Sequence, residues 1–370
     1  AWAYDGAKHS RIGTVVVPDD YLLTSPTRHD GIWMPISPFP SLALGALVLD
    51  NKWLRLGGSD RQLVLAADSV LVKGEARFEL VNTEVSCNGL VITNKGVMEL
   101  YGEGGSNPGL TVEHDAVLAD KSYFTVYAGE ATGVGTAAVG VEVGGRFDIF
   151  DNAWIYPWSH PTNGGSTRFA AGALTIAADS GINGVGKGYK NRVDAPAVAN
   201  GGPGWGGDAY AGGGYGGRGG GDKGGAIYGD ERYPLQCGSA SGDTSTYGTP
   251  GGGLIWLKVA GRFVLDGVLN ASGTSGSSIY GSGGSGGGVY VSCRLFEGTS
   301  GSLVADGGSG GTHTRGGGGG GRIAVWRVRH AYTGGLPSVK AGEGFATVLA
   351  EDGTVYWGDL PASGTIMMLR

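Results

Sequence analysis

Charge is scarce in this chain: charged residues make up 16% of the 370 positions, and the formal net charge is only −6. This slightly acidic balance argues against a basic nucleic-acid-binding protein. Together with a hydrophobic fraction of 41%, it also argues against a disordered polyelectrolyte. Long apolar runs are missing as well. The longest, Leu42 to Leu49, is far shorter than the roughly 20 residues that a membrane-spanning helix needs.

Cysteine is also rare, with only Cys87, Cys237 and Cys293. Three cysteines cannot all pair within one chain, so one disulfide plus a free thiol and three buried thiols both stay open. The chain begins with Ala1 and carries no signal-peptide pattern at its start, which predicts a processed protein or an excised fragment. A composition low in charge and rich in Gly, Ser, Thr, Tyr and Trp favours an extracellular or cell-surface location.

Glycine is abundant: 77 residues, about one in five, against an average near 7%. The glycines occur in clusters rather than at every third position, which excludes collagen. Each glycine costs about 1 kcal/mol inside a helix, so helix is disfavoured over most of the chain. The main Gly-free windows, 59–73 and 110–128, show the Val-rich alternation that is typical of strands. An all-β chain is therefore predicted.

Short alternating apolar runs follow one another through residues 41–186, most with Gly, Asn or Asp nearby. They are 47–49, 54–56, 63–65, 70–72, 78–80, 90–92, 97–100, 110–112, 124–126, 141–143, 147–149 and 174–176. Many small strands separated by turn residues indicate a solenoid, a sandwich or a barrel. Because the runs are shorter than a typical strand of about five or six residues, they favour the solenoid.

Four regions are predicted from the shifts in composition. Residues 1–40 form a Pro-rich N-terminal cap, 41–186 a set of β-helix coils, 187–252 a Gly-rich loop insertion, and 253–370 further coils with a C-terminal cap. The insertion carries interspersed Trp and Tyr, which linkers seldom do, so it is interpreted as an ordered loop. Its glycines would serve positions of positive φ or close backbone approach.

An internal repeat lies in the last of these regions. Gly253 to Gly273 aligns without a gap on Gly288 to Gly308, and a third start follows at Gly321, giving offsets of 35 and 33 residues. A period of 20–50 residues is typical of repeat architectures, in which each unit is buried by its neighbours. The predicted fold is therefore a parallel β-helix, or β-solenoid, with Gly-rich corner loops.

Two glycine strings carry a resemblance to a known group. They are Tyr215-Gly216-Gly217-Arg218-Gly219-Gly220, and Gly316 to Gly321 followed by Arg322-Ile323-Ala324-Val325. With the repeats between them, they resemble the glycine-rich, secreted repeat proteins of the parallel β-helix (β-solenoid) type over roughly residues 170–358. The resemblance implies an extracellular address and a β-solenoid. It carries no assigned chemistry.

Motifs for phosphate or metal chemistry are weak. The stretch from Gly181 to Lys187 fits most of a P-loop, but Gly188 stands where Ser or Thr is needed, and no helix-like segment follows. The six histidines show no ligand spacing for zinc, so no metal site is predicted. No cofactor is predicted either. Calcium is the one ion that the sequence leaves open, with no site located.

Two aromatic and basic clusters are candidates for carbohydrate recognition. From them, the candidate ligand-binding residues are Trp158, His160, Arg168, Tyr215, Arg218 and Asp222. Aromatic rings stack on sugars, while basic groups neutralise uronate carboxylates. No carboxylate pair with hydrolase spacing is evident, and no catalytic residue is identified. Asn270, in the sequon Asn270-Ala271-Ser272, is a candidate glycosylation site.

These observations predict an extracellular structural, adhesive or surface-assembly β-solenoid protein without catalysis. The alternative is a polysaccharide lyase or glycoside hydrolase that acts on acidic glycans in a groove of the β-helix. A carbohydrate-binding module without turnover is a third hypothesis. The expected partners are polysaccharide or copies of the chain itself.

Overall fold

The computed structural model describes residues 41–58, 62–103, 107–133, 135–190, 201–242, 248–276 and 281–362. Within these ranges the chain forms twenty β-strands and no helix, so the all-β prediction is confirmed. The predicted N-terminal cap, 1–40, lies outside the described residues.

Two parallel sheets contain all of these strands. The twelve-stranded sheet consists of β1 (Ser41–Asp50), β3 (Leu63–Lys73), β5 (Thr83–Ile92), β7 (Gly109–Val112), β8 (Ala116–Leu118), β10 (Ala137–Ile149), β12 (Ser166–Ile176), β14 (Leu254–Val259), β15 (Arg262–Leu265), β17 (Gly288–Gly298), β19 (Arg322–Tyr332) and β20 (Thr354–Asp359). The eight-stranded sheet consists of β2 (Trp53–Gly57), β4 (Arg77–Val81), β6 (Val97–Tyr101), β9 (Tyr123–Tyr127), β11 (Trp154–Trp158), β13 (Gly181–Asn183), β16 (Val268–Asn270) and β18 (Ser302–Val304).

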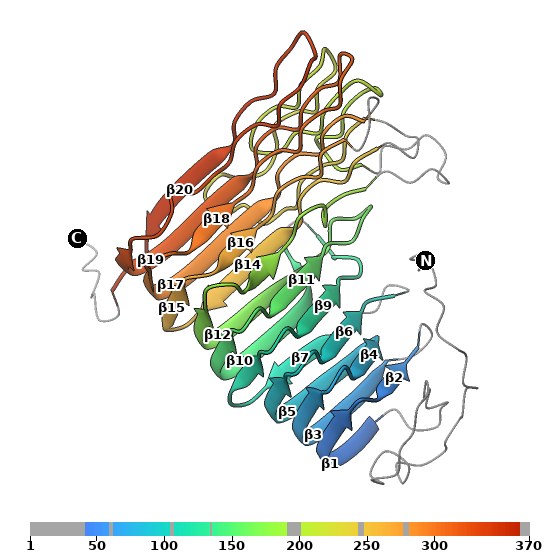
Figure 1. Ribbon diagram of the computed structural model, residues 1–370, viewed down its shortest axis with the longest axis vertical. Coiled ribbons are helices and arrows are strands. Elements are labelled where there is room, and N and C mark those ends of the chain that lie inside the picture. The colour runs from blue at the N-terminus through green and yellow to red at the C-terminus, as the bar shows by residue number, and fades with distance from the viewer. Residues whose placement is uncertain are drawn as a thin grey trace, which may run out of the picture.

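The chain passes repeatedly between the two sheets and returns beside the strand of its previous pass (Figure 1). Three consecutive pairs stay in the twelve-stranded sheet: β7 and β8, β14 and β15, and β19 and β20. The register of the last strands is close to the predicted repeat. Leu254 pairs with Gly288, and Gly288 pairs with Arg322, so both steps are 34 residues rather than the aligned 35 and 33. In the N-terminal half the separation between register partners is less regular: Arg77 pairs with Val97, 20 residues on, and Val97 pairs with Tyr123, 26 residues on.

Several strands are longer than the short runs that predict them. β10 spans 13 residues and joins the predicted runs 141–143 and 147–149. Its register with β12 shifts between Val143 and Arg146, where Gly144 and Gly145 lie. Glycine in a strand interior often marks such an irregularity, because it lets the strand bend locally while pairing continues on either side.

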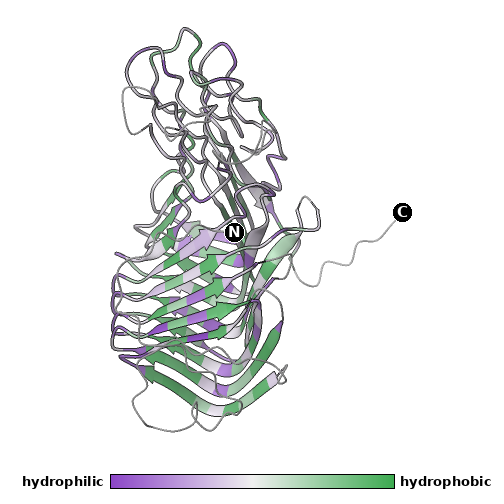
Figure 2. Ribbon diagram, turned by 90° about the vertical axis from the view of Figure 1, so that its right-hand side faces the viewer, coloured by the Kyte–Doolittle hydropathy of each residue, from purple (hydrophilic) through white to green (hydrophobic). Residues whose placement is uncertain are grey.

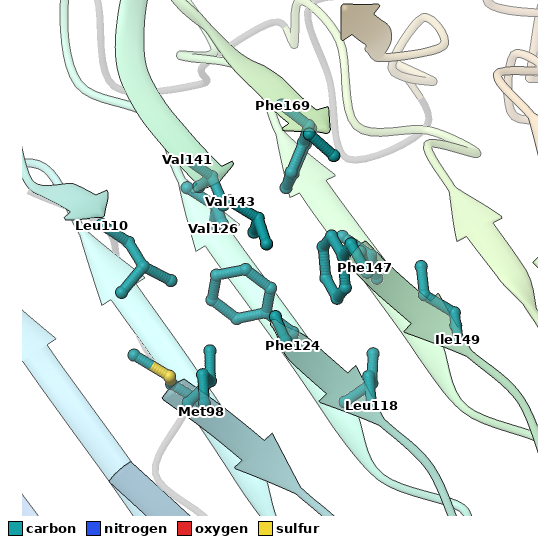
Figure 3. Packing of buried hydrophobic residues seen from close by; sticks show 14 of the residues in the cluster. Met98, Leu110, Leu118, Phe124, Val126, Val141, Val143, Phe147, Ile149 and Phe169 are labelled. Carbon is teal, nitrogen blue, oxygen red and sulfur yellow. The ribbon is translucent and has the colours of Figure 1, made fainter. Parts of the chain in front are cut away.

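The core lies between the inner faces of the two sheets and is built from columns of residues in register. One column of the twelve-stranded sheet runs through ten strands: Leu42, Leu65, Val85, Leu110, Val141, Phe169, Leu257, Val291, Val325 and Trp357. Facing it, Phe124 of the eight-stranded sheet meets Phe169 edge-on, with ring centroids 6.5 Å apart (Figure 3). Apolar burial of this kind stabilises by about 25 cal/mol per Å².

Left-handed backbone positions form the turns between the sheets in the N-terminal half. Asn94 and Lys95, Asp120 and Lys121, and Asp151 and Asn152 all have φ between 50° and 64°. Asn and Asp tolerate this region better than most residues. The amide of Lys95 donates to Asp120 O, and that of Lys121 to Asp151 O, both at 2.9 Å, so the turns also stack. These turns thus use Asn, Asp and Lys where Gly-rich corners are predicted.

Glycine instead concentrates in a set of extended segments outside the sheets, here called the glycine bundle: 201–225, 281–287, 305–310 and 316–321 (Figure 1). In Figure 2 much of this region is pale, whereas green hydrophobic and purple hydrophilic stretches alternate along the strands. Backbone hydrogen bonds join its segments directly. The amide of Gly213 donates to Gly283 O at 3.0 Å, which links the predicted insertion to the chain between β16 and β17.

In segment 316–321, backbone amides that are three residues apart donate to the same neighbouring segment. Gly316 and Gly319 donate to Tyr210 and Gly213 of one neighbour, Gly318 and Gly321 donate to Gly308 and Ala305 of another, and Gly320 donates to Glu351. Three residues per turn is the repeat of a polyproline II helix, whose amides point outward to other chains. Close approach explains the glycines: a Cβ on Gly319 would clash with the carbonyl oxygen of Gly217.

The three cysteines are buried and none is in a disulfide. Cys87 and Cys293 belong to the main core, and Cys237 packs in a smaller cluster with Tyr189 and Trp256. Of the two alternatives open from the sequence, the structure therefore has three buried thiols.

Candidate binding face of the eight-stranded sheet

The outer face of the eight-stranded sheet carries polar and aromatic side chains that lie in register on neighbouring strands. Successive residues of a strand point to opposite faces, so outward residues of paired strands also form columns. Three columns cross β2, β4, β6, β9 and β11: Trp53, Arg77, Val97, Tyr123 and Trp154; Arg55, Glu79, Glu99, Thr125 and Tyr156; and Gly57, Val81, Tyr101, Tyr127 and Trp158.

Two carboxylates lie in register near the start of this face. Glu79 and Glu99 are only 3% and 6% exposed. Arg77 joins them, with its Nε 2.7 Å from Glu79 Oε1 and its Nη2 2.6 Å from Glu99 Oε2. The indole of Trp53 also donates to Glu79, at 3.0 Å. Burial raises the pKa of Glu79, and the positive charge of Arg77 opposes that shift.

An aromatic column, defined as Tyr101, Tyr127 and Trp158, lies at the other end of the same strands. The rings of Tyr101 and Tyr127 stack at 4.5 Å and 7°, and those of Tyr127 and Trp158 at 5.7 Å and 18°. Offset stacking at these distances is favourable beyond the area that it buries. The parallel register holds the three rings in one row, because each closes its strand at the same level.

Lys187 covers the end of this column. Its Nζ lies 4.9 Å from the ring centroid of Trp158 and 5.0 Å from that of Tyr156, and it donates to Val185 O at 3.3 Å. The residue is 8% exposed, and burial lowers the pKa of its amine to about 8. Cation–π attraction offsets part of the cost of burying the charge.

The six predicted ligand-binding residues lie in three parts of the molecule. Trp158 closes the aromatic column, and His160 follows it in the next loop, where its Nδ1 accepts from the amide of Asn163 at 3.1 Å. Arg168 lies instead on β12 of the twelve-stranded sheet, where it pairs with Glu142 of β10. The stretch from Trp158 to Arg168 therefore crosses from one sheet to the other.

Tyr215, Arg218 and Asp222 belong to the glycine bundle. Tyr215 is fully buried, with its ring 4.7 Å from that of Tyr228, so it packs within the protein. Arg218 is exposed, and its guanidinium donates to the carbonyl oxygen of Asp222 at 3.4 Å. The candidate glycosylation residue, Asn270, is half-buried on β16, and its Oδ1 accepts from the amide of Ser272 at 2.9 Å.

Sequence reasoning missed Glu79, Glu99, Tyr101, Tyr127 and Lys187. The sequence held part of the information, because Glu99 lies in the predicted strand 97–100 and Tyr101 directly follows it. Aligning that strand with the next would have placed Tyr101 beside Tyr127. The number of residues between register partners on neighbouring strands varies too much for such an alignment to be evident from the sequence.

Metal and membrane features are limited in the described ranges. No three His, Cys, Asp or Glu side chains gather there in a way that could hold a metal ion, and calcium stays a prediction without a site. No helix in the same ranges is long and apolar enough to cross a membrane. Comparison of the chain with protein-family models, curated proteins and solved structures found no match.

Proposed function

We propose that the chain is a β-solenoid of the parallel β-helix type that serves as a structural or adhesive element at the cell surface or outside the cell, without catalysis. The observation that carries the proposal is the parallel register that continues from β1 to β20. Because each strand pairs on both sides except at the two ends, pulling or local opening must break many backbone hydrogen bonds together.

The glycine bundle supports the same role. Its segments are held by backbone hydrogen bonds and offer few side chains for chemistry. In the described part of the chain the twelve-stranded sheet ends in the edge strands β1 and β20, and edge strands present unpaired amides and carbonyls that another chain can pair with. Copies of the chain are therefore the partner that the proposal favours.

Small-angle scattering and negative-stain electron microscopy test this function. We expect elongated particles that associate end to end as the concentration rises, and retention on the surface of cells that export the protein. Compact particles that stay single at all concentrations, with release of all protein into the medium, would contradict the proposal.

A polysaccharide lyase is the second candidate, and the position of Lys187 favours it. An amine with a pKa of about 8 beside an aromatic column is suited to take the C5 proton of a uronate as the C4–O bond breaks. Only a small part of Lys187 is exposed, so a substrate needs the loop around it to move. Incubation with oligogalacturonate and alginate, followed by absorbance of the unsaturated product, tests this candidate. Wild-type turnover that is lost in Lys187→Met would support it, and absence of product would reject it.

A further inference from the structure

An open groove of about 640 Å³ lies at the corner between the sheets, at the opposite end of β11 from the aromatic column. Its lining is Lys121, Asp151, Asn152, Trp154, Asp179 and Val268. Trp154 begins β11 and Trp158 ends it, so at about 3.3 Å per residue the two indoles belong to separate places on the face. None of the residues lining the groove belongs to the aromatic column or the Glu79–Glu99 pair.

Gly181 allows the indole of Trp154, which lines the groove, to lie close to the backbone of β13. It is the register partner of Trp154 on the next strand, and Val268 follows it on β16. A Cβ on Gly181 would lie 2.8 Å from Cζ3 of Trp154. Without that Cβ, the indole lies across β13. Its Nε1 donates to Asn152 Oδ1 at 3.0 Å, which fixes the orientation of the ring.

Polar side chains surround this indole. Lys121, Asp151, Asn152 and Asp179 are all exposed, and each has a left-handed backbone with φ between 55° and 64°. The stacked turns hold them in place, since the amide of Lys121 donates to Asp151 O at 2.9 Å. Within the described residues neither the carboxylate of Asp151 nor that of Asp179 forms an ion pair. The rim therefore offers two carboxylates, an amide and an ammonium to a ligand.

We propose that this groove binds a neutral pyranose unit of a glycan. The indole of Trp154 offers a flat apolar surface for the C–H face of the sugar ring. Carboxylates accept charge-assisted hydrogen bonds from neighbouring hydroxyls, and the Lys121 ammonium donates one. A mostly apolar floor with a few converging polar groups is the usual form of a small-molecule site. Two carboxylates against one ammonium leave the rim negative, which disfavours uronates.

Titration of protein labelled with ¹⁵N-tryptophan tests the proposal. The indole signal of Trp154 is assigned as the one that Trp154→Phe removes. Neutral hexasaccharides of glucose, xylose and mannose are then added in turn, with oligogalacturonate and calcium chloride in parallel. We expect at least one neutral oligosaccharide to shift the Trp154 signal in a saturable way, and Trp154→Ala to abolish its binding by calorimetry.

Asp151→Asn and Asp179→Asn keep the side-chain volume at exposed positions, so both variants should fold. Each should weaken binding about tenfold, as expected for a hydrogen bond to a charged group. Lys258→Met, at an exposed position of β14 on the twelve-stranded sheet, is the control and should leave binding unchanged. A Trp154 signal that no neutral saccharide moves, or that moves only with oligogalacturonate or only with calcium, would overturn the proposal. These results do not depend on whether the chain assembles, which scattering measures separately.

Discussion

Gly319 donates its backbone amide to the carbonyl of Gly213 at 2.9 Å, so two segments separated by β14 to β18 in the chain lie side by side in the glycine bundle. Neither residue contributes a side chain to the contact. The approach is set by the absence of a Cβ, because one on Gly319 would clash with the carbonyl oxygen of Gly217. The bundle is therefore stabilised through the backbone and is sensitive to the smallest substitution.

Gly319→Ala should lower the free energy of unfolding by about 2–4 kcal/mol, since a methyl group forced against backbone must displace a whole segment. Urea denaturation followed by circular dichroism measures the change. Gly133→Ala is the matched control, because a Cβ there has no neighbour within 4 Å, and it should change stability by less than about 0.5 kcal/mol. Equal stabilities for the two variants would show that the close packing of the bundle contributes little.

The apolar strands could be predicted from the sequence because alternation records which residues face a core. Phe78, Met98 and Phe124 occupy one column of the eight-stranded sheet, and all three lie in predicted runs. Alternation says nothing about which strand is the neighbour. The steps from Arg77 to Val97 and from Val97 to Tyr123 differ, so the aromatic column and the Glu79–Glu99 pair emerge only once the strands are in register.

The glycine bundle was predictable in composition but not in structure. Residues 201–225 lie within the predicted insertion 187–252, an ordered loop whose glycines are expected to serve close approach or positive φ. Close approach is the main reason, since only Gly202 and Gly221 in that segment have positive φ. The partners of the segment come from later parts of the chain, and no local pattern records them.

Arg77→Met should destabilise the protein by about 3–5 kcal/mol, because it leaves the buried carboxylates of Glu79 and Glu99 without their shared partner. Thermal or urea denaturation at pH 7 measures this loss. Asp115 and Arg146 form a more exposed pair at 3.3 Å, so Arg146→Met is the control and should cost at most about 1 kcal/mol.

The pH dependence of this loss follows from the direction of the shift. The pKa of Glu79 is raised in the folded protein, so its contribution is fully present below the unfolded value of 4.5 and declines as pH rises through the folded pKa. Removing Arg77 takes away the larger of the two positive charges that oppose the shift, the other being Arg55, so the decline should become larger. Adding Glu79→Gln to Arg77→Met should flatten it again. If the single and double variants gave parallel pH profiles, the assignment to Glu79 would be wrong.

Lys187 should make stability rise with pH in the alkaline range. Burial lowers its pKa from 10.5 to about 8, so the unfolded chain binds the proton more tightly and stability increases as pH rises from about 8 towards 10.5. Lys187→Met keeps an apolar side chain over the rings and removes this pH-dependent contribution, which is at most about 3.4 kcal/mol at about 1.36 kcal/mol per pKa unit. Urea midpoints at pH 7 and 9.5 measure it.

The exposed Lys258 of β14 provides the control, because Lys258→Met should leave the pH profile of the wild type unchanged. We expect the wild type to gain stability relative to Lys187→Met between pH 7 and 9.5. A constant difference between them over that range would mean that the amine is not held in a desolvated position.

All three thiols should be unreactive in the native protein. Burial raises the pKa of Cys87 to about 11 and those of Cys237 and Cys293 to about 12, so very little thiolate exists at pH 8. Since the thiolate is the nucleophile, Ellman's reagent should label none of them within minutes at that pH, and all three in 8 M urea. Three thiols released by urea without a reductant would agree with the absence of a disulfide. A count of one would indicate a disulfide, and rapid labelling before urea would show that at least one cysteine lies in a segment that opens readily.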